Sequence, residues 1–249
     1  MKHIFAFENK SDYEQFDGII VNFRKKLSNY QKILEEQYAL KEAPKAIVWT
    51  SEELATNIFS NLPIPAFTNE NIIYFSPDLS AWRRLFIQQL EGRKAPEIRR
   101  YYEHLSENQL VTILGHELTH HSDLFVDEFD EERVDSIWFE EGMCDYLARK
   151  YILSETEFME IVNAEAQMIV LFKDKYGHHS LDEFGGESYQ GSLTSIMYNY
   201  WRSFQAVKYL VEDKADHDID HIFKEYQSWN HNGRKVPLTD YFNLPDHFS

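Results

Sequence analysis

The sequence has only one cysteine, Cys144, in 249 residues, so an internal disulfide bond is excluded. Its nine glycines and seven prolines are too few and too scattered to mark a flexible linker or a collagen-like repeat. Basic side chains are also scarce, because 25 lysines and arginines face 42 aspartates and glutamates, for a net charge of −17. A surface this negative repels phosphate backbones and anionic lipid headgroups, which argues against nucleic acid and membrane surfaces as partners.

Long hydrophobic runs are missing as well. The longest, such as Ile72 to Phe75 and Met168 to Phe172, are far shorter than the ~20 residues of a membrane-spanning helix. No apolar signal segment follows Met1 and Lys2. Together with the single cysteine, these absences predict a cytoplasmic protein. What is present, 43% hydrophobic and 15% aromatic residues, is enough for a sizeable core.

The first third of the chain predicts a helix followed by short strands. Apolar residues recur at helical spacing from Ser11 to about Glu42, and Ser11-x-x-Glu14 resembles a capping box at the start. Ala46 to Thr50 is rich in β-formers and predicts a strand, after which Thr50-x-x-Glu53 predicts the start of another helix.

A turn-like Asn69-Glu70-Asn71 separates Ala66 to Thr68 from Ile72 to Ser76, which predicts a hairpin or two neighbouring strands. From Asp78 onward the periodicity is almost wholly helical. The expected helices are 79–90, 97–104, 109–125, 136–153, 155–175, 192–212 and 218–229.

These patterns predict an α+β fold that is mostly helical. We expect one domain over residues 1–249, with a small β-containing N-terminal lobe, residues 1 to about 105, and a helical lobe, residues 106–249. Two loops are expected, an acidic one from Asp127 to Asp135 and a polar one from Gly177 to Gly191.

One helix carries a pattern typical of metal chemistry. Ser106-x-x-Gln109 caps it, and it contains His116-Glu117-Leu118-Thr119-His120. Histidines four residues apart lie on one helix face and can share a Zn²⁺ ion, whereas Glu117 is placed to reach a metal-bound water instead of the metal. His121 follows the motif and is expected off the ligand face, as a solvated side chain or one that supports a ligand.

A catalytic zinc usually has three protein ligands, so a third must lie elsewhere. The metzincin pattern is excluded, because Asp123 and Val126 stand where it requires glycine and histidine. Glu141, on the next predicted helix, is our expected third ligand, with Asp145 four residues later accepting the distal N–H of a ligand histidine. Glu140 and the carboxylates of Asp127 to Asp135 are the alternatives.

Gly142 stands beside the proposed ligand Glu141. A glycine at that position lets two helices approach closely, so we expect another helix to pack directly against this one.

At this point the sequence resembles the gluzincins, the thermolysin-like and aminopeptidase-like zinc metallopeptidases. Their pattern is H-E-x-x-H, a spacer of about twenty residues, then Glu with Asp four residues later. Trp138-x-x-Glu141-Gly142 looks like the ligand helix of the aminopeptidase-like branch. The resemblance covers Gln109 to about Tyr151 and implies a zincin-like fold, with the active-site helix between the two lobes and zinc on His116, His120 and Glu141.

In gluzincins a phenol or imidazole from a later helix donates a hydrogen bond to the oxyanion of the tetrahedral intermediate. By resemblance, Tyr200 or Tyr198 takes this role here. The competing interpretation is packing, because the chain has 15 tyrosines and an aromatic ring on a core-facing helix usually packs.

The expected function is zinc-dependent hydrolysis of a peptide or protein, with Glu117 as general base. No Gly-Ala-Met-Glu-Asn stretch, which grips a free amino terminus in classical aminopeptidases, precedes the motif, so endo- and exopeptidase activity both stay open. Ile72 to Ser76 is expected to be the edge strand that binds an extended peptide.

Three alternatives remain open at this level. The same metal site fits a non-catalytic, zinc-stabilised peptide-binding or regulatory module, or the hydrolysis of a non-peptide amide or an epoxide. Another divalent metal is also compatible with these ligands. The sequence leaves the oligomeric state open.

Overall fold

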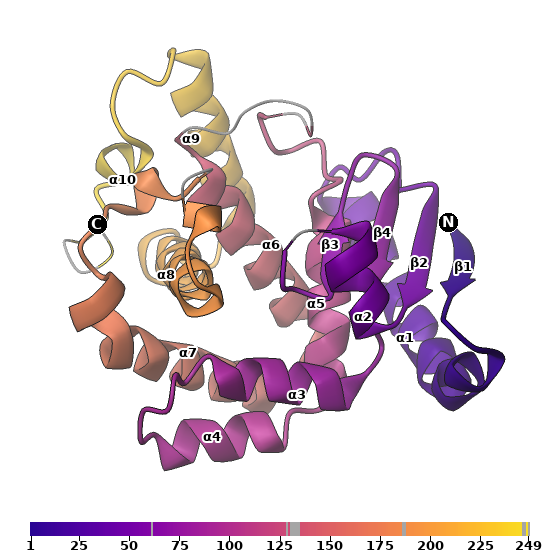
Figure 1. Ribbon diagram of the computed structural model, residues 1–249. Helices are drawn as coiled ribbons and strands as arrows, with labels where there is room; N and C mark the ends of the chain where they lie inside the picture. Colours follow the sequence, from indigo (N-terminus) through magenta and orange to yellow (C-terminus); the bar gives the residue numbers. More distant parts are fainter. Residues whose placement is uncertain (61, 128, 130–134, 186–187, 246–247, 249) are drawn as a thin grey trace. The chain divides into compact units, whose positions relative to one another are not determined.

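A computed structural model describes residues 1–249 except 61, 128, 130–134, 186–187, 246–247 and 249 (Figure 1). Most of the described chain is helical, and one small sheet of four strands lies in its N-terminal part. This confirms the predicted α+β, mostly helical class. None of the described helices is long and apolar enough to cross a membrane.

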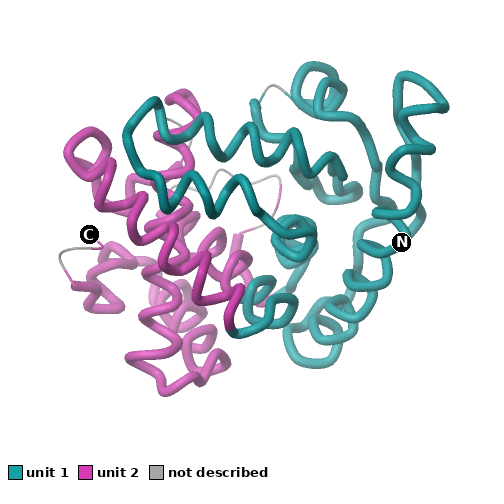
Figure 2. The backbone as a smooth tube through the Cα atoms, turned by 90° about the horizontal axis from the view of Figure 1, so that it is seen from below, with its two compact units in different colours: residues 1–123, 147–155 teal, residues 124–146, 156–249 magenta. Residues whose placement is uncertain are grey.

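The chain divides into two units, which Figure 2 colours separately. Unit 1 contains residues 1–123 and 147–155, and unit 2 contains residues 124–146 and 156–249. Helix α6 (Ile137–Ile152) begins in unit 2 and ends in unit 1. The single domain with sub-lobes about 1–105 and 106–249 stays a prediction.

The sheet of unit 1 has the order β1-β2-β4-β3. Strands β1 (Lys2–Ala6), β2 (Ala46–Thr50) and β4 (Ile72–Phe75) run parallel, and β3 (Ala66–Thr68) pairs antiparallel with β4. Every residue of β2 is buried, as its continuous apolar sequence requires for a central strand.

Two expectations about these strands meet different outcomes. The hairpin of 66–68 with 72–76 is confirmed, because β3 and β4 pair from Ala66 with Phe75 to Thr68 with Ile73. The edge-strand assignment of Ile72 to Ser76 is wrong, because β4 pairs with β2 on one side and β3 on the other. The edge next to β4 therefore belongs to β3.

Helix α1 (Lys10–Gln37) covers the sheet with one apolar face. Its buried residues recur at helical spacing: Ile20, Phe23, Leu27, Tyr30 and Leu34. Phe23 meets Phe75 of β4 edge to face, with ring centroids 6.1 Å apart. The capping-box prediction is wrong, because Asn9 is the N-cap residue, and the helix ends before Glu42, where Ala39 turns to a φ of 51°.

The remaining helices of unit 1 are α2 (Glu52–Leu54), the π-helical η1 (Ala55–Phe59), α3 (Leu79–Gln88), α4 (Pro96–Glu103) and α5 (Glu107–Thr119). Ser51, not Thr50, caps α2, since its hydroxyl accepts from the Leu54 N–H at 3.2 Å. Asp78 caps α3 by accepting from the N–H groups of Ser80 and Ala81. Each cap satisfies helix-start N–H groups that have no partner within the helix.

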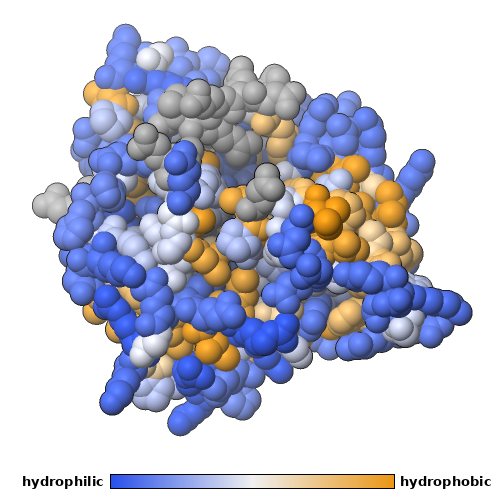
Figure 3. All heavy atoms as spheres, viewed as in Figure 1, coloured by the Kyte–Doolittle hydropathy of each residue, from blue (hydrophilic) through white to orange (hydrophobic). Residues whose placement is uncertain are grey.

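One face of unit 1 exposes hydrophobic side chains. Figure 3 shows them gathered over α2, η1 and the neighbouring strands. Ile58 is the most exposed of this part of the chain, at 68% of its surface, and Phe59 and Ile4 are also exposed. Phe59 packs on Tyr74 of β4 at a ring-centroid distance of 5.1 Å, so η1 covers part of the outer sheet face.

Unit 2 is helical. It holds the first part of α6, nearly all of α7 (Glu155–Tyr176), α8 (Leu193–Tyr209), α9 (Ile219–His231) and α10 (Leu238–Tyr241). Three short helical turns join them: η2 (Leu181–Glu183), η3 (Ser188–Gln190) and η4 (Leu210–Lys214). Its core is aromatic, with Phe139 stacked on Tyr226 at 4.2 Å and on Phe242 at 5.7 Å between ring centroids.

Every helix expected from Asp78 onward is present, with ends that differ by a few residues. The largest difference is at α5, which ends at Thr119, not near Phe125. The polar loop expected from Gly177 to Gly191 contains η2 and η3, and its residues 186 and 187 lie outside the described chain. Most of the expected acidic loop, residues 128 and 130–134, also lies outside it.

Candidate metal centre

Helix α5 is the buried central helix of unit 1. Ser106 caps it as predicted, accepting from the Gln109 N–H at 3.4 Å. A side chain added at Gly115 would lie 2.7 Å from Ile152 Cδ1 and 3.2 Å from both Ala148 Cβ and a Tyr30 ring carbon. An alanine there would force the end of the Ile152 side chain to move, so the glycine one residue before His116 eases the packing of α1 and α6 on α5.

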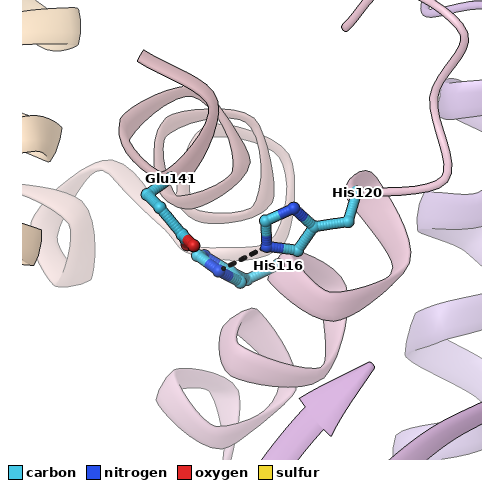
Figure 4. Close-up of side chains that lie close together, drawn as sticks. All are labelled: His116, His120 and Glu141. Carbon is cyan, nitrogen blue, oxygen red and sulfur yellow. Dashed lines mark hydrogen bonds between the residues drawn. The ribbon is translucent and has the colours of Figure 1, made fainter. Parts of the chain in front are cut away.

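His116, in the last turn of α5, and His120, the C-cap residue of that helix, point toward each other (Figure 4). Their Nε2 atoms are 3.1 Å apart, and the ring planes meet at 74°. Two nitrogens bound tetrahedrally to one zinc at about 2.05 Å lie roughly 3.3 Å apart. The imidazole pair thus already has the separation that a shared metal ion requires.

The chain after His120 turns back toward the sheet. The N–H groups of His121 and Ser122 bond to carbonyls three residues earlier, which tightens the last turn and ends α5. His121 is buried, and its Nε2 lies 2.8 Å from Thr68 Oγ1 of β3. Burial lowers the pKa of His121 to about 4, and the nearby His120 contributes a smaller part of this shift. The expectation of a solvated His121 is wrong, and the neutral ring ties β3 to α5.

Glu141 is the third member of the group. One ligand atom each of His116, His120 and Glu141 lies within 4.8 Å of the others, and Figure 4 shows the carboxylate directed at His116. His116 and Glu141 are only 7% and 5% exposed. Within the described chain this is the one group of three or more His, Cys, Asp or Glu side chains with ligand atoms this close.

The alternatives for the third ligand are not members of this group. Glu140 is buried one position earlier on α6, and neither it nor Asp127 or Asp135 belongs to the cluster. The carboxylates at positions 128 and 130–132 lie outside the described residues.

Glu117 stands on α5 between the two histidines and is 9% exposed. It is not part of the three-residue group. Glu117 is therefore a buried carboxylate next in sequence to His116 that does not belong to the candidate ligand group.

Gly142 lets α6 and α8 approach as closely as expected. A Cβ atom there would lie 2.7 Å from the Ser203 carbonyl carbon and 2.7 Å from Val207 Cγ2. The backbone of α8 therefore passes directly over α6, one residue after Glu141, which confirms the predicted close approach.

The two tyrosines predicted as oxyanion donors have different surroundings. Tyr200 on α8 lies with its hydroxyl 2.9 Å from that of Tyr189, and Tyr189 donates to Glu141 Oε1 at 3.3 Å. Tyr198 packs instead against Tyr176 and Trp201, and burial raises the pKa of its hydroxyl. Hydrogen bonds thus link Tyr200 to the candidate ligand Glu141.

The sequence did not single out Tyr189. It stands on the short turn η3 in an aperiodic loop, where spacing carries no information about its neighbours. Asp145 is half-buried on α6, four residues after Glu141, and its role beside a ligand histidine stays a prediction.

Comparisons with protein-family models, curated proteins and solved structures gave no match. The resemblance to the gluzincins therefore depends on the motif residues and on their arrangement.

Proposed function

We propose that this protein is a zinc-dependent metallopeptidase of the gluzincin type. The observation that carries the proposal is the convergence of His116, His120 and Glu141, whose ligand atoms lie within 4.8 Å of one another. Two imidazoles and a carboxylate form a catalytic ligand set for zinc, which leaves a position for water or substrate. A zinc ion held there would activate water and polarise a substrate carbonyl.

In this proposal three side chains near the zinc have different roles. Glu117 accepts a proton from the attacking water and delivers it to the leaving amine. Tyr200, rather than Tyr198, donates to the developing oxyanion, because its hydroxyl is already linked through Tyr189 to Glu141. Asp145 orients a ligand histidine.

The proposed substrate is a peptide in extended conformation. Strand β3 is the outer strand of the sheet beside β4, and an outer strand offers unpaired main-chain groups to an added strand. Thr68 of β3 lies 2.8 Å from His121, the residue that follows the ligand His120. A peptide added along β3 would thus run close to the end of α5. We also propose a cytoplasmic location, with which the single cysteine, Cys144, agrees because it allows no internal disulfide bond.

The test is cleavage of a mixed peptide library by zinc-loaded protein, read by mass spectrometry. We expect wild type to cleave and Glu117→Gln to lose about 10²- to 10⁴-fold in rate while it keeps its zinc. Glu107→Gln is the matched control, since Glu107 lies exposed on the same helix and Gln retains an acceptor for the Asn22 amide.

Equal cleavage by wild type and Glu117→Gln would refute the mechanism. A zinc-loaded wild type that cleaves no peptide would instead favour the non-catalytic peptide-binding module, and the same library then serves to measure binding. Non-peptide amides and epoxides tested in parallel show whether the protein hydrolyses one of these substrates instead of a peptide.

A further inference from the structure

Backbone hydrogen bonds and ring stacking hold Tyr189 in place in unit 2. Its turn is closed by the Ser188 N–H, which bonds to the Gly185 carbonyl at 2.8 Å, and by the Gly191 N–H, which bonds to the Ser188 carbonyl at 3.1 Å. The Tyr189 ring stacks on Phe184 with centroids 5.7 Å apart and planes 30° apart. The loop thereby fixes the direction of the phenol.

Phe184 also contacts the ring of Tyr200. The Tyr200 ring meets it edge to face at a centroid distance of 5.3 Å, and Phe184 itself is buried. The two tyrosines therefore pack on the same aromatic ring, one from η3 and one from α8. This arrangement brings their hydroxyls to 2.9 Å.

The number of protons fixes the direction of the hydrogen bonds. A phenol carries a single proton to donate. Since Tyr189 donates to Glu141 Oε1 at 3.3 Å, the bond between the two phenols must use the proton of Tyr200. The chain of donors runs from Tyr200 to Tyr189 to Glu141.

We infer that Tyr189 is a positioning residue that holds one carboxylate oxygen of Glu141, so that the other is presented to the metal. The inference rests on the proposed function. Hydrogen-bond partners of ligands orient them, and removing such a partner weakens metal affinity about 10- to 100-fold. Tyr189 acts through Glu141 and does not itself touch the metal.

A consequence concerns Tyr200. Its hydroxyl proton is directed at Tyr189, so donation to a substrate oxyanion requires Tyr200 to exchange that partner for the substrate. The bond from Tyr189 to Glu141 does not use the Tyr200 proton, so under this proposal the ligand stays oriented while Tyr200 changes partner.

The test measures zinc affinity by competition with a chromophoric chelator, together with the visible spectrum of the cobalt-substituted protein. Tyr189→Phe should bind zinc about 10- to 100-fold more weakly and alter the cobalt bands. Tyr176→Phe is the matched control, because it removes a tyrosine hydroxyl of unit 2 that bonds to Ser192 at 3.0 Å. It should bind as wild type does.

A second background separates positioning from general destabilisation. In Glu141→Ala, which retains the histidine pair, adding Tyr189→Phe should change zinc affinity by less than about twofold, because the two substitutions share one interaction. The inference would be overturned if Tyr189→Phe weakened zinc binding equally in the wild-type and Glu141→Ala proteins, or if it did not weaken zinc binding in the protein that retains Glu141. Either result would leave the peptidase proposal intact. A wild type that binds no zinc would overturn both.

Discussion

At the residue scale, the feature that most needs explaining is the burial of ionisable groups in α5 and α6. His116, Glu117 and Glu141 are 7%, 9% and 5% exposed. Buried charges are costly unless they are paired or coordinate a metal. A shared cation would be such a partner for His116, His120 and Glu141, which supports the proposal that this cluster binds a metal.

Tyr226 provides a residue-scale prediction about pH. It is fully buried, and this burial is the main reason why the pKa of its hydroxyl is raised. Nearby carboxylates raise the pKa further. The folded state therefore keeps this proton at pH values where the unfolded chain, with a pKa of about 10, has lost it. Its contribution to stability is complete below pH 10 and falls as pH rises above 10.

Tyr226→Phe removes that titration. Unfolding in urea between pH 8 and 11 should show the wild type losing stability above pH 10 more steeply than the variant. If the difference between the two proteins stayed constant across this range, the assigned direction would be wrong.

At the element scale, a glycine adjoins a proposed ligand on each of the two helices. Gly115 precedes His116, and Gly142 follows Glu141. At each, an added Cβ would meet neighbouring atoms at 2.7 Å, so no larger residue fits without movement. Close helix packing is therefore what fixes the places of the ligands.

Gly142→Ala should destabilise the protein by about 1–3 kcal/mol, because the clash with the Ser203 backbone outweighs the gain in helix propensity. Gly18→Ala is the matched control on α1, where nothing lies within 4 Å of the added methyl group. It should stabilise by about 0.5–1 kcal/mol. Urea unfolding measures both, and a stabilising Gly142→Ala would show that α6 and α8 are not in contact at this point.

Helices and motif residues could be predicted from the sequence, whereas the order of the strands could not. Helical periodicity located α3 through α9, and the motif located His116, Glu117 and His120, because both are local properties of the chain. The order of strands is not local. β4 was expected at the edge, yet the sheet places β3 outside it, and β1 went unpredicted because Lys2 and His3 hide its short apolar run.

The same limit applies to the candidate site. Glu141 was reachable because it lies on a periodic helix at a recognisable distance from the motif. Tyr189 was not, since its contact with Glu141 depends on the fold of an aperiodic loop. The end of α5 was missed for a similar reason, as the backbone tie from the Asp123 N–H to the Ala39 carbonyl joins distant parts of the chain.

At the scale of the whole molecule, the chain combines a strong excess of acidic residues with the candidate metal centre of His116, His120 and Glu141. A net charge of −17 repels anionic partners, and for the proposed peptidase we expect it to attract basic peptides by electrostatic steering. The central claim is narrower, namely that one zinc ion binds to His116, His120 and Glu141.

The most direct test of that claim is the zinc content of the purified, zinc-loaded and desalted protein, measured by elemental analysis. We predict one zinc per chain in wild type and in Glu117→Gln. His116→Ala and His120→Ala should hold almost none, and Glu141→Ala should hold much less than wild type. Exposed His104, whose Nδ1 lies 2.8 Å from the Arg100 carbonyl, provides the control His104→Ala, which should keep its zinc. A wild type without zinc, or a His116→Ala variant that retains a full equivalent, would contradict the account.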